Sequence, residues 1–261
     1  MKQAITPTAE LVPVAYAEVL LGLAEERGIR REQLLQRAGV REQVLGTPNG
    51  RLSFLDFNQL AFAALALTAD EGLGLAMGQR LNVSTHGILG YAVLSSASFG
   101  QALQFALKYY RVLGLAFDLE LLEGDSHLQL RASENLPLGP LSRFAAEGLF
   151  GSLHTIAGFL LGEPPADFAL GFAYPEPPYA ERYRQQFGVT PQFDQPQHWL
   201  SIPRHYLTRP MALANPATVQ MCEQQCEALL ATLDVQEGLL PRLRRLLLAR
   251  PGEFPDLDSV A

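Results

Sequence analysis

The histidines and cysteines of this sequence, its most reactive side chains, lack the spacing of a metal site. The five histidines are spread along the chain, as His86, His127, His154, His198 and His205. Alternation predicts that His127 points outward on a strand, and polar surroundings predict loops around His198 and His205. Cys222 and Cys226 share a helical face, but two thiols fall short of the four ligands of a structural zinc site. We therefore expect no metal and no other cofactor.

Signatures of catalysis are missing from the sequence as well. It contains no Gly-rich phosphate loop of the Walker or Rossmann type and no Gly-x-Ser-x-Gly nucleophile motif. Glu147 and His154 could together suggest a small hydrolase or lyase. Seven residues of helix separate them by about 10 Å along the axis, however, which is too far for direct contact. We expect that the protein is not an enzyme.

Binding of a small organic effector is the chemistry that the sequence favours. Such a site needs an apolar wall with a few convergent polar groups. The candidates for one wall are His86, Tyr91, Ser95, Tyr109 and Phe117, and those for another are Arg143, Phe144 and Glu147. Arg143 would suit a carboxylate-bearing effector, because a guanidinium group presents a bidentate fork of donors.

Each candidate also has a purely structural interpretation. Tyr91, Tyr109 and Phe144 could be ordinary core residues. Arg143 and Glu147 are four residues apart and could form an ion pair on a helix surface. His86 could cap a helix. The residue types alone leave these alternatives open.

The elements that must position these residues begin with helices. Residues 14–82 have helical periodicity, with Ser53 and Asp56 opening one of the helices. Residues 86–96 are nearly uncharged and predict a buried helix. Ser98 and Gln101 form a capping box at the start of an amphipathic helix that reaches about Leu113.

After Gly114 the periodicity changes from helix to strand. Alternating residues on both sides of the turn at 123–125 predict a hairpin with one buried face, namely Phe117, Leu119, Leu121, Leu128, Leu130 and Ala132. A long apolar helix over 140–161 follows, then a strand at 168–173, a helix at 179–187 and brief strands at 192–193 and 199–202. The second half therefore reads β-β-α-β-α-β. The predicted fold class is α+β, with N-terminal helices followed by a small antiparallel sheet backed by the long helix.

Composition limits the choice of partners and compartment. The net charge is −7 and hydrophobic residues make up 48% of the chain. Such a chain has no overall electrostatic footprint for DNA, so any DNA contact would be made by another domain. The N-terminus has no signal-peptide pattern, and no stretch approaches the ~20 apolar residues of a membrane span. We expect a cytoplasmic protein that does not bind membranes.

The C-terminal region has a different character. One helical stripe over 217–233 consists of Val219, Cys222, Cys226, Leu229 and Leu233. This stripe could pack on its own domain or form the seam of a homodimer, and we favour the dimer. A basic helix is predicted over 237–250. Asp256 is a plausible N-cap for another helix, which predicts that the protein continues beyond Ala261.

Three segments of the sequence resemble transcription activators of the AraC/XylS type. The first is HGILGYAVLSS at 86–96 with Ala102-Leu103 and Lys108-Tyr109-Tyr110-Arg111. The second extends from Tyr179 through Phe187-Gly188-Val189 and Leu200-Ser201-Ile202-Pro203 to Asn215-Pro216. The third is Leu246-Leu247-Leu248 with Gly252-Glu253-Phe254-Pro255-Asp256-Leu257.

This resemblance implies a particular domain organisation. Residues 1–210 would be an arabinose-binding-like effector domain, residues 211–251 a linker with possible dimerisation helices, and residues 252–261 the start of a helix-turn-helix DNA-binding domain. The family label does not assign arabinose as the ligand. The helices followed by β-β-α-β also resemble haem-based nitric-oxide sensors, but residues 98–113 lack the histidine that haem would require.

The sequence therefore predicts a ligand-responsive switch. Effector binding would change how residues 217–250 are presented to the DNA-binding domain or to a second subunit, through unequal affinity for two states. Two alternatives are a stand-alone small-molecule binding module and a small enzyme, neither with a role in transcription.

Overall fold

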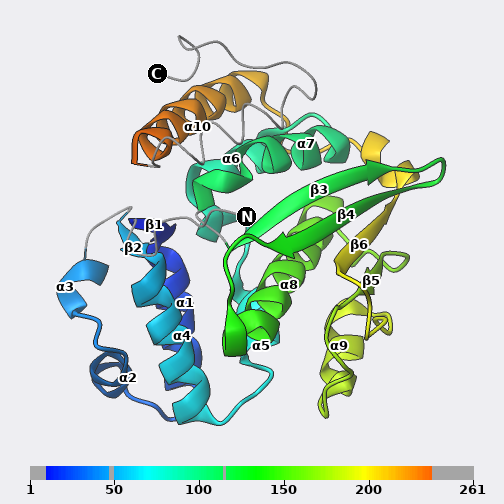
Figure 1. The fold of residues 1–261 in the computed structure, drawn as a ribbon. Coiled ribbons are helices and arrows are strands. Elements are labelled where there is room, and N and C mark those ends of the chain that lie inside the picture. Colours follow the sequence, from blue (N-terminus) through cyan, green and yellow to red (C-terminus); the bar gives the residue numbers. More distant parts are fainter. Residues whose placement is uncertain (1–9, 47–49, 114–115, 237–261) are drawn as a thin grey trace, which may run out of the picture.

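The computed structural model describes residues 10–46, 50–113 and 116–236. The basic helix predicted over 237–250 and the capped segment at Asp256 lie outside these residues. Among the described residues, the N-terminal helices, the sheet with its backing helix, and a C-terminal helix form three successive parts (Figure 1).

The N-terminal part contains a strand pair that the sequence did not reveal. Its elements are β1 (Glu10–Pro13), α1 (Val14–Glu25), α2 (Arg31–Ala38), α3 (Glu42–Leu45), β2 (Arg51–Ser53) and α4 (Phe54–Thr68). β1 pairs antiparallel with β2. The prediction of helices alone over 14–82 was wrong at β2, because a three-residue strand is too short to show alternation. The predicted cap of α4 is confirmed, since Ser53 Oγ accepts a hydrogen bond from the Asp56 amide at 3.0 Å.

Short helices connect this part to the sheet. They are α5 (Leu73–Arg80), the 3₁₀ helix η1 (Val83–His86), α6 (Gly87–Ser95), α7 (Phe99–Tyr109) and the 3₁₀ helix η2 (Tyr110–Leu113). Ser98 caps α7 by accepting from the Gln101 amide at 3.2 Å, as the capping box predicts. α6 is buried on one side only, because Tyr91 remains 56% exposed.

The second half has the predicted β-β-α-β-α-β order. Its elements are β3 (Phe117–Glu123), β4 (His127–Glu134), the 3₁₀ helix η3 (Gly139–Leu141), α8 (Ser142–Leu161), β5 (Ala169–Gly171), α9 (Ala180–Phe187), β6 (His198–Pro203) and the 3₁₀ helix η4 (Arg204–Thr208). The sheet order is β3-β4-β6-β5, and every neighbouring pair is antiparallel. The fold class is therefore α+β, as predicted.

Two local predictions in this half were wrong. Residues 192–193 do not form a strand, and Gln192 makes only an isolated bridge to Gly171. His198 lies not in a polar loop but in β6, where it is 6% exposed and contacts the rings of Phe117, Phe150 and Phe172. The buried aromatic surroundings, which come from distant segments, overrode the polar residues that flank His198 in sequence.

The long helix α8 joins the parts of the domain. On one side it packs against the sheet, where Phe150 contacts Phe172. On another side it crosses α5 at very close range, because a Cβ placed on Gly78 would lie 2.7 Å from the Gly151 Cα. The backbones of α5 and α8 are therefore in direct contact at Gly78 and Gly151. Gly148, one turn earlier on α8, has more room, because a Cβ there would meet no atom nearer than 3.9 Å.

Among the described residues, one segment, Gly139–Leu161, is long and apolar enough to cross a membrane, contrary to the expectation from the sequence, but 61% of its most apolar window is buried in the domain. It is the central helix of a folded core, as the packing of α8 against α5 and the sheet requires.

The last described helix, α10 (Pro216–Gln236), covers α6 and α7 from outside (Figure 1). Cys222 and Cys226 are fully buried in a cluster with α6, α7 and η2, and Val219 and Leu229 pack against that cluster. The predicted stripe therefore packs on its own domain, which is one of the two alternatives that the sequence left open. The side chain of Leu233 lies outside the description.

The glycines of α5 and α8 give a matched test of this packing. Gly78→Ala should lower the free energy of unfolding by about 1–3 kcal/mol, because its methyl group would overlap the backbone of α8. Gly148→Ala has room for the methyl group and should raise it by roughly 0.5–1 kcal/mol through helix propensity. Urea unfolding of both variants measures the difference. Equal effects would contradict the close crossing.

Candidate functional site

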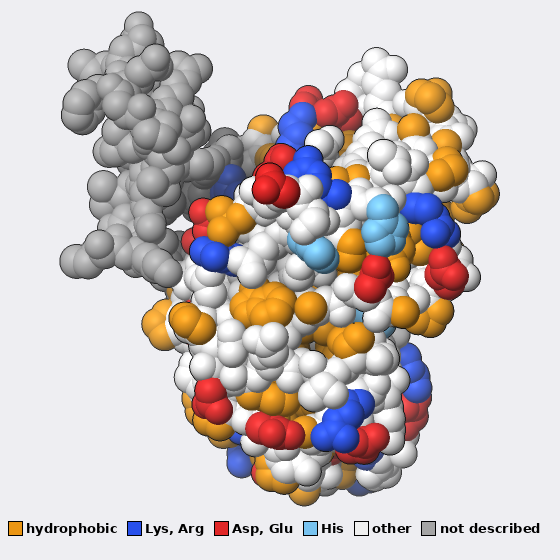
Figure 2. Space-filling view, turned by 90° about the vertical axis from the view of Figure 1, so that its right-hand side faces the viewer, with side chains coloured by type: hydrophobic (Ala, Val, Ile, Leu, Met, Phe, Trp, Pro, Cys, Tyr) orange, Lys and Arg blue, Asp and Glu red, His pale blue; other side chains and the backbone are white. Residues whose placement is uncertain are grey.

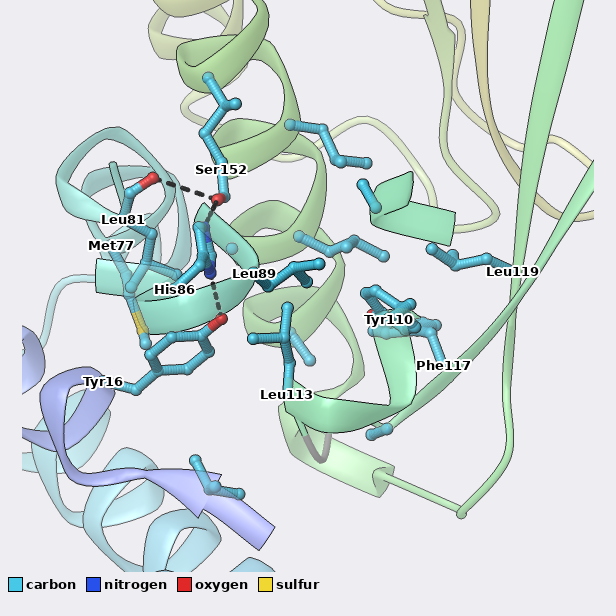
Figure 3. A pocket seen from close by; sticks show the side chains of 18 of the residues that line it. Tyr16, Met77, Leu81, His86, Leu89, Tyr110, Leu113, Phe117, Leu119 and Ser152 are labelled. Atoms are coloured by element: carbon cyan, nitrogen blue, oxygen red, sulfur yellow. Dashed lines mark hydrogen bonds between the residues drawn. The ribbon is translucent and has the colours of Figure 1, made fainter. Parts of the chain in front are cut away.

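A cavity of about 140 Å³ lies between the N-terminal helices, α8 and the first strand of the sheet (Figure 3). Its wall is almost entirely apolar. The apolar side chains of the wall include those of Met77, Leu81, Leu89, Leu103, Leu113, Phe117, Leu119, Phe144, Ala145, Leu149 and Leu153. An apolar wall with few polar groups is the composition of a small-molecule site.

The polar groups of the wall are also few. Among the described residues that line the cavity they belong to Tyr16, Asn58, His86, Tyr110 and Ser152, and none of the lining residues is acidic, lysine or arginine. The cavity therefore offers hydrogen bonds and no fixed charge.

Three of these groups form a hydrogen-bonded relay across the wall (Figure 3). The Tyr16 hydroxyl lies 2.6 Å from His86 Nδ1, and His86 Nε2 lies 3.0 Å from Ser152 Oγ. Ser152 Oγ donates its only proton to the Leu81 carbonyl at 3.1 Å. The relay ties together α1, the end of η1, the end of α5 and α8.

The direction of the relay fixes the protonation of His86. Because the Ser152 proton is already used, His86 Nε2 must donate, and in a neutral imidazole Nδ1 then accepts from Tyr16. Burial agrees with this, since it lowers the pKa of His86 to about 4. Burial likewise raises the pKa of Tyr16 above its ordinary value, so its hydroxyl remains a donor. All three side chains of the relay are satisfied without a ligand.

Tyr110 is different, because its buried hydroxyl has no hydrogen-bond partner among the described residues. The residue begins η2 and lines the cavity near Leu113 and Phe117 (Figure 3). Buried polar groups in folded proteins nearly always have a partner, which can be a water or a ligand. The unsatisfied hydroxyl marks the place where a bound molecule would gain a hydrogen bond.

The structure brings only some of the residues predicted from sequence to this cavity. His86, Phe117 and Phe144 line it. Tyr91 points to solvent, and Ser95 is buried at the C-terminal end of α6, away from the cavity wall. His86 precedes α6 but makes no side-chain cap, so the capping interpretation of this residue was wrong.

Tyr109 faces away from the cavity, toward α10. It is 1% exposed, and its hydroxyl donates to Glu223 at 3.1 Å or Glu227 at 3.0 Å. Lys108 adds an ion pair to Glu223 at 2.8 Å. The neighbouring residues Tyr109 and Tyr110 therefore serve different surfaces, one holding α10 and the other lining the cavity.

Arg143 and Glu147 lie on another side of α8, outside the cavity lining. Arg143 pairs with Glu71 at 3.3 Å and lies over the rings of Tyr174 and Tyr179. Glu147 is fully buried, so the two do not form a surface ion pair. Its Oε1 accepts hydrogen bonds from Tyr179 at 2.7 Å and from Tyr183.

The hydrogen bonds of the buried Glu147 are made with Tyr179, Tyr183 and the Leu75 backbone, and not with His154. Burial raises the pKa of Glu147 to about 7, and the hydroxyl groups of Tyr183 and Tyr179 oppose that rise. His154 is also buried, between the rings of Phe168 and Phe187. Neither group lines the cavity.

Sequence reasoning missed the other polar residues of the wall. Tyr16 and Ser152 belong to helices 70 and 66 residues away from His86, so no local pattern connects them. Tyr110 follows Tyr109 directly, and a helical pattern cannot tell which of two adjacent tyrosines faces a cavity. One feature of the sequence could have pointed to Ser152, namely that it is a polar residue within the apolar helix predicted over 140–161.

Among the described residues, no group of three or more histidine, cysteine, aspartate or glutamate side chains could hold a metal ion. The face seen in Figure 2 carries acidic and basic side chains interspersed with small apolar areas, without a basic stripe. This face lacks the charge pattern of a DNA-binding surface.

An α+β domain with an apolar cavity, and with a helix docked on two elements of the cavity wall, has the form of a small-molecule binding domain. The model of the family described as the arabinose-binding domain of AraC transcription regulators, N-terminal, matches residues 28–211. The chain belongs to this family of transcription regulators.

The relatives agree with the family. The chain is 67% identical over 261 residues to an ornithine utilization regulator of Pseudomonas aeruginosa, covering 100% of this chain and 77% of that protein. An HTH-type transcriptional regulator of Mycobacterium tuberculosis is 27% identical over 265 residues, covering 98% of this chain and 76% of the relative. The transcriptional regulator CdpR of P. aeruginosa has a similar fold, with a TM-score of 0.54 and 19% identity over 91% of this chain and 74% of that one.

The relay predicts a pH dependence that a His86→Gln variant isolates. The pKa of His86 is about 4 in the folded protein and about 6.5 when unfolded. Its contribution to stability is present above pH 6.5 and is lost as pH falls toward 4. The wild type should therefore lose on the order of 2–3 kcal/mol relative to the variant over that interval. Urea unfolding from pH 7 to 4 tests this, and identical slopes would contradict a neutral, buried His86.

Glu147 predicts the opposite trend. Its pKa of about 7 in the folded protein lies above the ordinary value of 4.5. The stability that it contributes is present below pH 4.5 and is lost as pH rises through 7. Glu147→Gln, which cannot ionise, should therefore become steadily more stable relative to the wild type between pH 5 and 8. A constant difference in the free energy of unfolding would show that Glu147 does not titrate there.

Proposed function

We propose that this chain is the effector-sensing part of an AraC-type transcription regulator and that the 140 Å³ cavity is its effector site. The observation that carries the proposal is that Tyr110, whose buried hydroxyl lacks a partner, lines a largely apolar cavity within the matched family domain. Family membership supports a role in transcription, and the cavity supports the binding of a small molecule.

The wall of the cavity supports a route from effector to output. Leu89 of α6 and Leu113 of η2 line the cavity and also belong to the cluster that buries Cys222 and Cys226 of α10. A bound molecule that displaces these leucines would directly shift the position in which α10 packs against the domain. α10 precedes the segments from residue 237 onward. Its position would therefore bias how those segments are presented to the DNA-binding domain or to a second subunit. The bias requires unequal affinity of the effector for the two arrangements.

We carry the domain boundaries and partners forward as part of this proposal. Residues 1–210 would sense the effector, 211–251 would link and transmit, and 252–261 would lead into the helix-turn-helix domain, which alone would contact DNA. A cytoplasmic homodimer fits a regulator that reads paired half-sites. Since Cys222 and Cys226 are used within the chain, dimerisation through α10 would need its exposed face, where Met221 is 51% exposed.

The chemical identity of the effector is the least constrained part of the proposal. The 67% identical relative is named for ornithine utilization, which supports control of amino-acid utilisation by this chain. A carboxylate-bearing effector, which Arg143 suggested, would have to bind on the opposite side of α8 from the cavity. The cavity instead favours a ligand without charge.

Filling the cavity tests the proposal. Ala145→Leu places three further carbons at the cavity wall and should abolish the change in transcription that ornithine in the medium produces at the regulated promoter. Ala66→Leu, the same change at an exposed position of α4, is the control. Promoter activity and protein level are measured with each variant in the complete regulator. A full response by Ala145→Leu at normal protein level would exclude the cavity as the effector site.

A further inference from the structure

We infer that the ligand of this cavity is a compact, uncharged molecule of about seven non-hydrogen atoms with one oxygen acceptor, which the Tyr110 hydroxyl binds. The inference rests on the proposed function and specifies the chemical class of the effector. It separates the effector of the cavity from ornithine, although the 67% identical relative is named for ornithine utilization.

The size follows from the volume. The cavity measures about 140 Å³. An apolar protein cavity of ~150 Å³ holds a molecule as large as benzene. A small ring or a branched chain therefore fits, and a long acyl chain does not.

The absence of charge follows from the wall. Among the described lining residues there is no acidic, lysine or arginine side chain. His86 is the lining residue that could become charged, and burial keeps it neutral. A buried ammonium or carboxylate without a partner is strongly unfavourable. Ornithine carries two ammonium groups and a carboxylate, and the cavity offers no counter-charge to any of them.

The single acceptor follows from the hydrogen bonds. Tyr16, His86 and Ser152 use their protons within the relay, so none of them has a proton left for a ligand. Asn58 also lines a hollow of the outer surface beside Phe62, which places it at the edge of the cavity. The Tyr110 hydroxyl is buried and unsatisfied. Burial raises the pKa of Tyr110 well above its ordinary value, so the group remains a donor and requires an acceptor.

The position of Tyr110 also connects this hydrogen bond to the output. Tyr109 anchors α10 through Glu223 and Glu227, and Tyr110 begins η2, where the α-helical α7 becomes a 3₁₀ helix. A ligand that holds Tyr110 restrains the turn from which Tyr109 reaches α10.

The test uses three probes and the purified protein. Cyclohexanone offers a carbonyl oxygen, methylenecyclohexane has the same shape without the acceptor, and ornithine carries charge. Calorimetric titration should show that the wild type binds cyclohexanone about tenfold more tightly than methylenecyclohexane, the value of one hydrogen bond. Tyr110→Phe should remove this preference and retain the affinity for methylenecyclohexane. Tyr109→Phe, the same change one residue earlier, should leave the preference for cyclohexanone over methylenecyclohexane unaltered.

Several outcomes would overturn the inference. They are the absence of binding by either ring, a preference for cyclohexanone that persists in Tyr110→Phe, or ornithine binding that Ala145→Leu abolishes. These results are distinct from failure of the proposed function. If Ala145→Leu abolishes regulation while neither ring binds, the cavity is the sensor and its ligand class is wrong. If Ala145→Leu regulates normally, the proposed function itself fails.

Discussion

The close crossing of α5 and α8 is the constraint on which the rest of the domain depends. Gly78 and Gly151 allow the two backbones to approach so closely that no side chain fits between them. With α8 held there, Phe150 packs against the sheet, and Phe144, Gly148 and Ser152 are presented to the cavity. The cavity is thus defined in part by a backbone contact between two helices that both contribute residues to its wall.

The same arrangement places a shared boundary between the large hydrophobic core and the smaller cluster that holds α10. The large core contains the N-terminal helices, α8 and the sheet, and a second cluster holds α10. α6 and η2 lie between the cavity and the second cluster, with Leu89 and Leu113 lining both. A ligand bound in the cavity would contact residues that also pack against α10. Its effect on α10 would therefore need no long-range pathway. The unsatisfied Tyr110 and the anchoring Tyr109 occupy adjacent positions on that boundary.

The sequence predicted those features that depend on local physics. The alternation around Phe117 and Leu130 identified the β3–β4 hairpin, and Ser53 and Ser98 marked two helix starts correctly. It could not show which faces of α7 and α8 meet the cavity, because that depends on packing between segments far apart in sequence. Arg143 and Glu147 therefore seemed to belong to a pocket, although Glu147 instead bonds to the backbone of α5 at Leu75 and to Tyr183 of α9, on another side of the helix. The relay of Tyr16, His86 and Ser152 was equally hidden, since each residue looks ordinary within its own helix.

The central claim is that the cavity holds the effector at Tyr110. The most direct measurement is a high-resolution electron-density map of the regulator purified from cells in which its target genes are induced. The account predicts density for a compact non-protein molecule in the cavity, with an oxygen within hydrogen-bond distance of Tyr110 Oη. Density for ordered water alone in the cavity, with an effector bound beside Arg143 and Glu147, would contradict it.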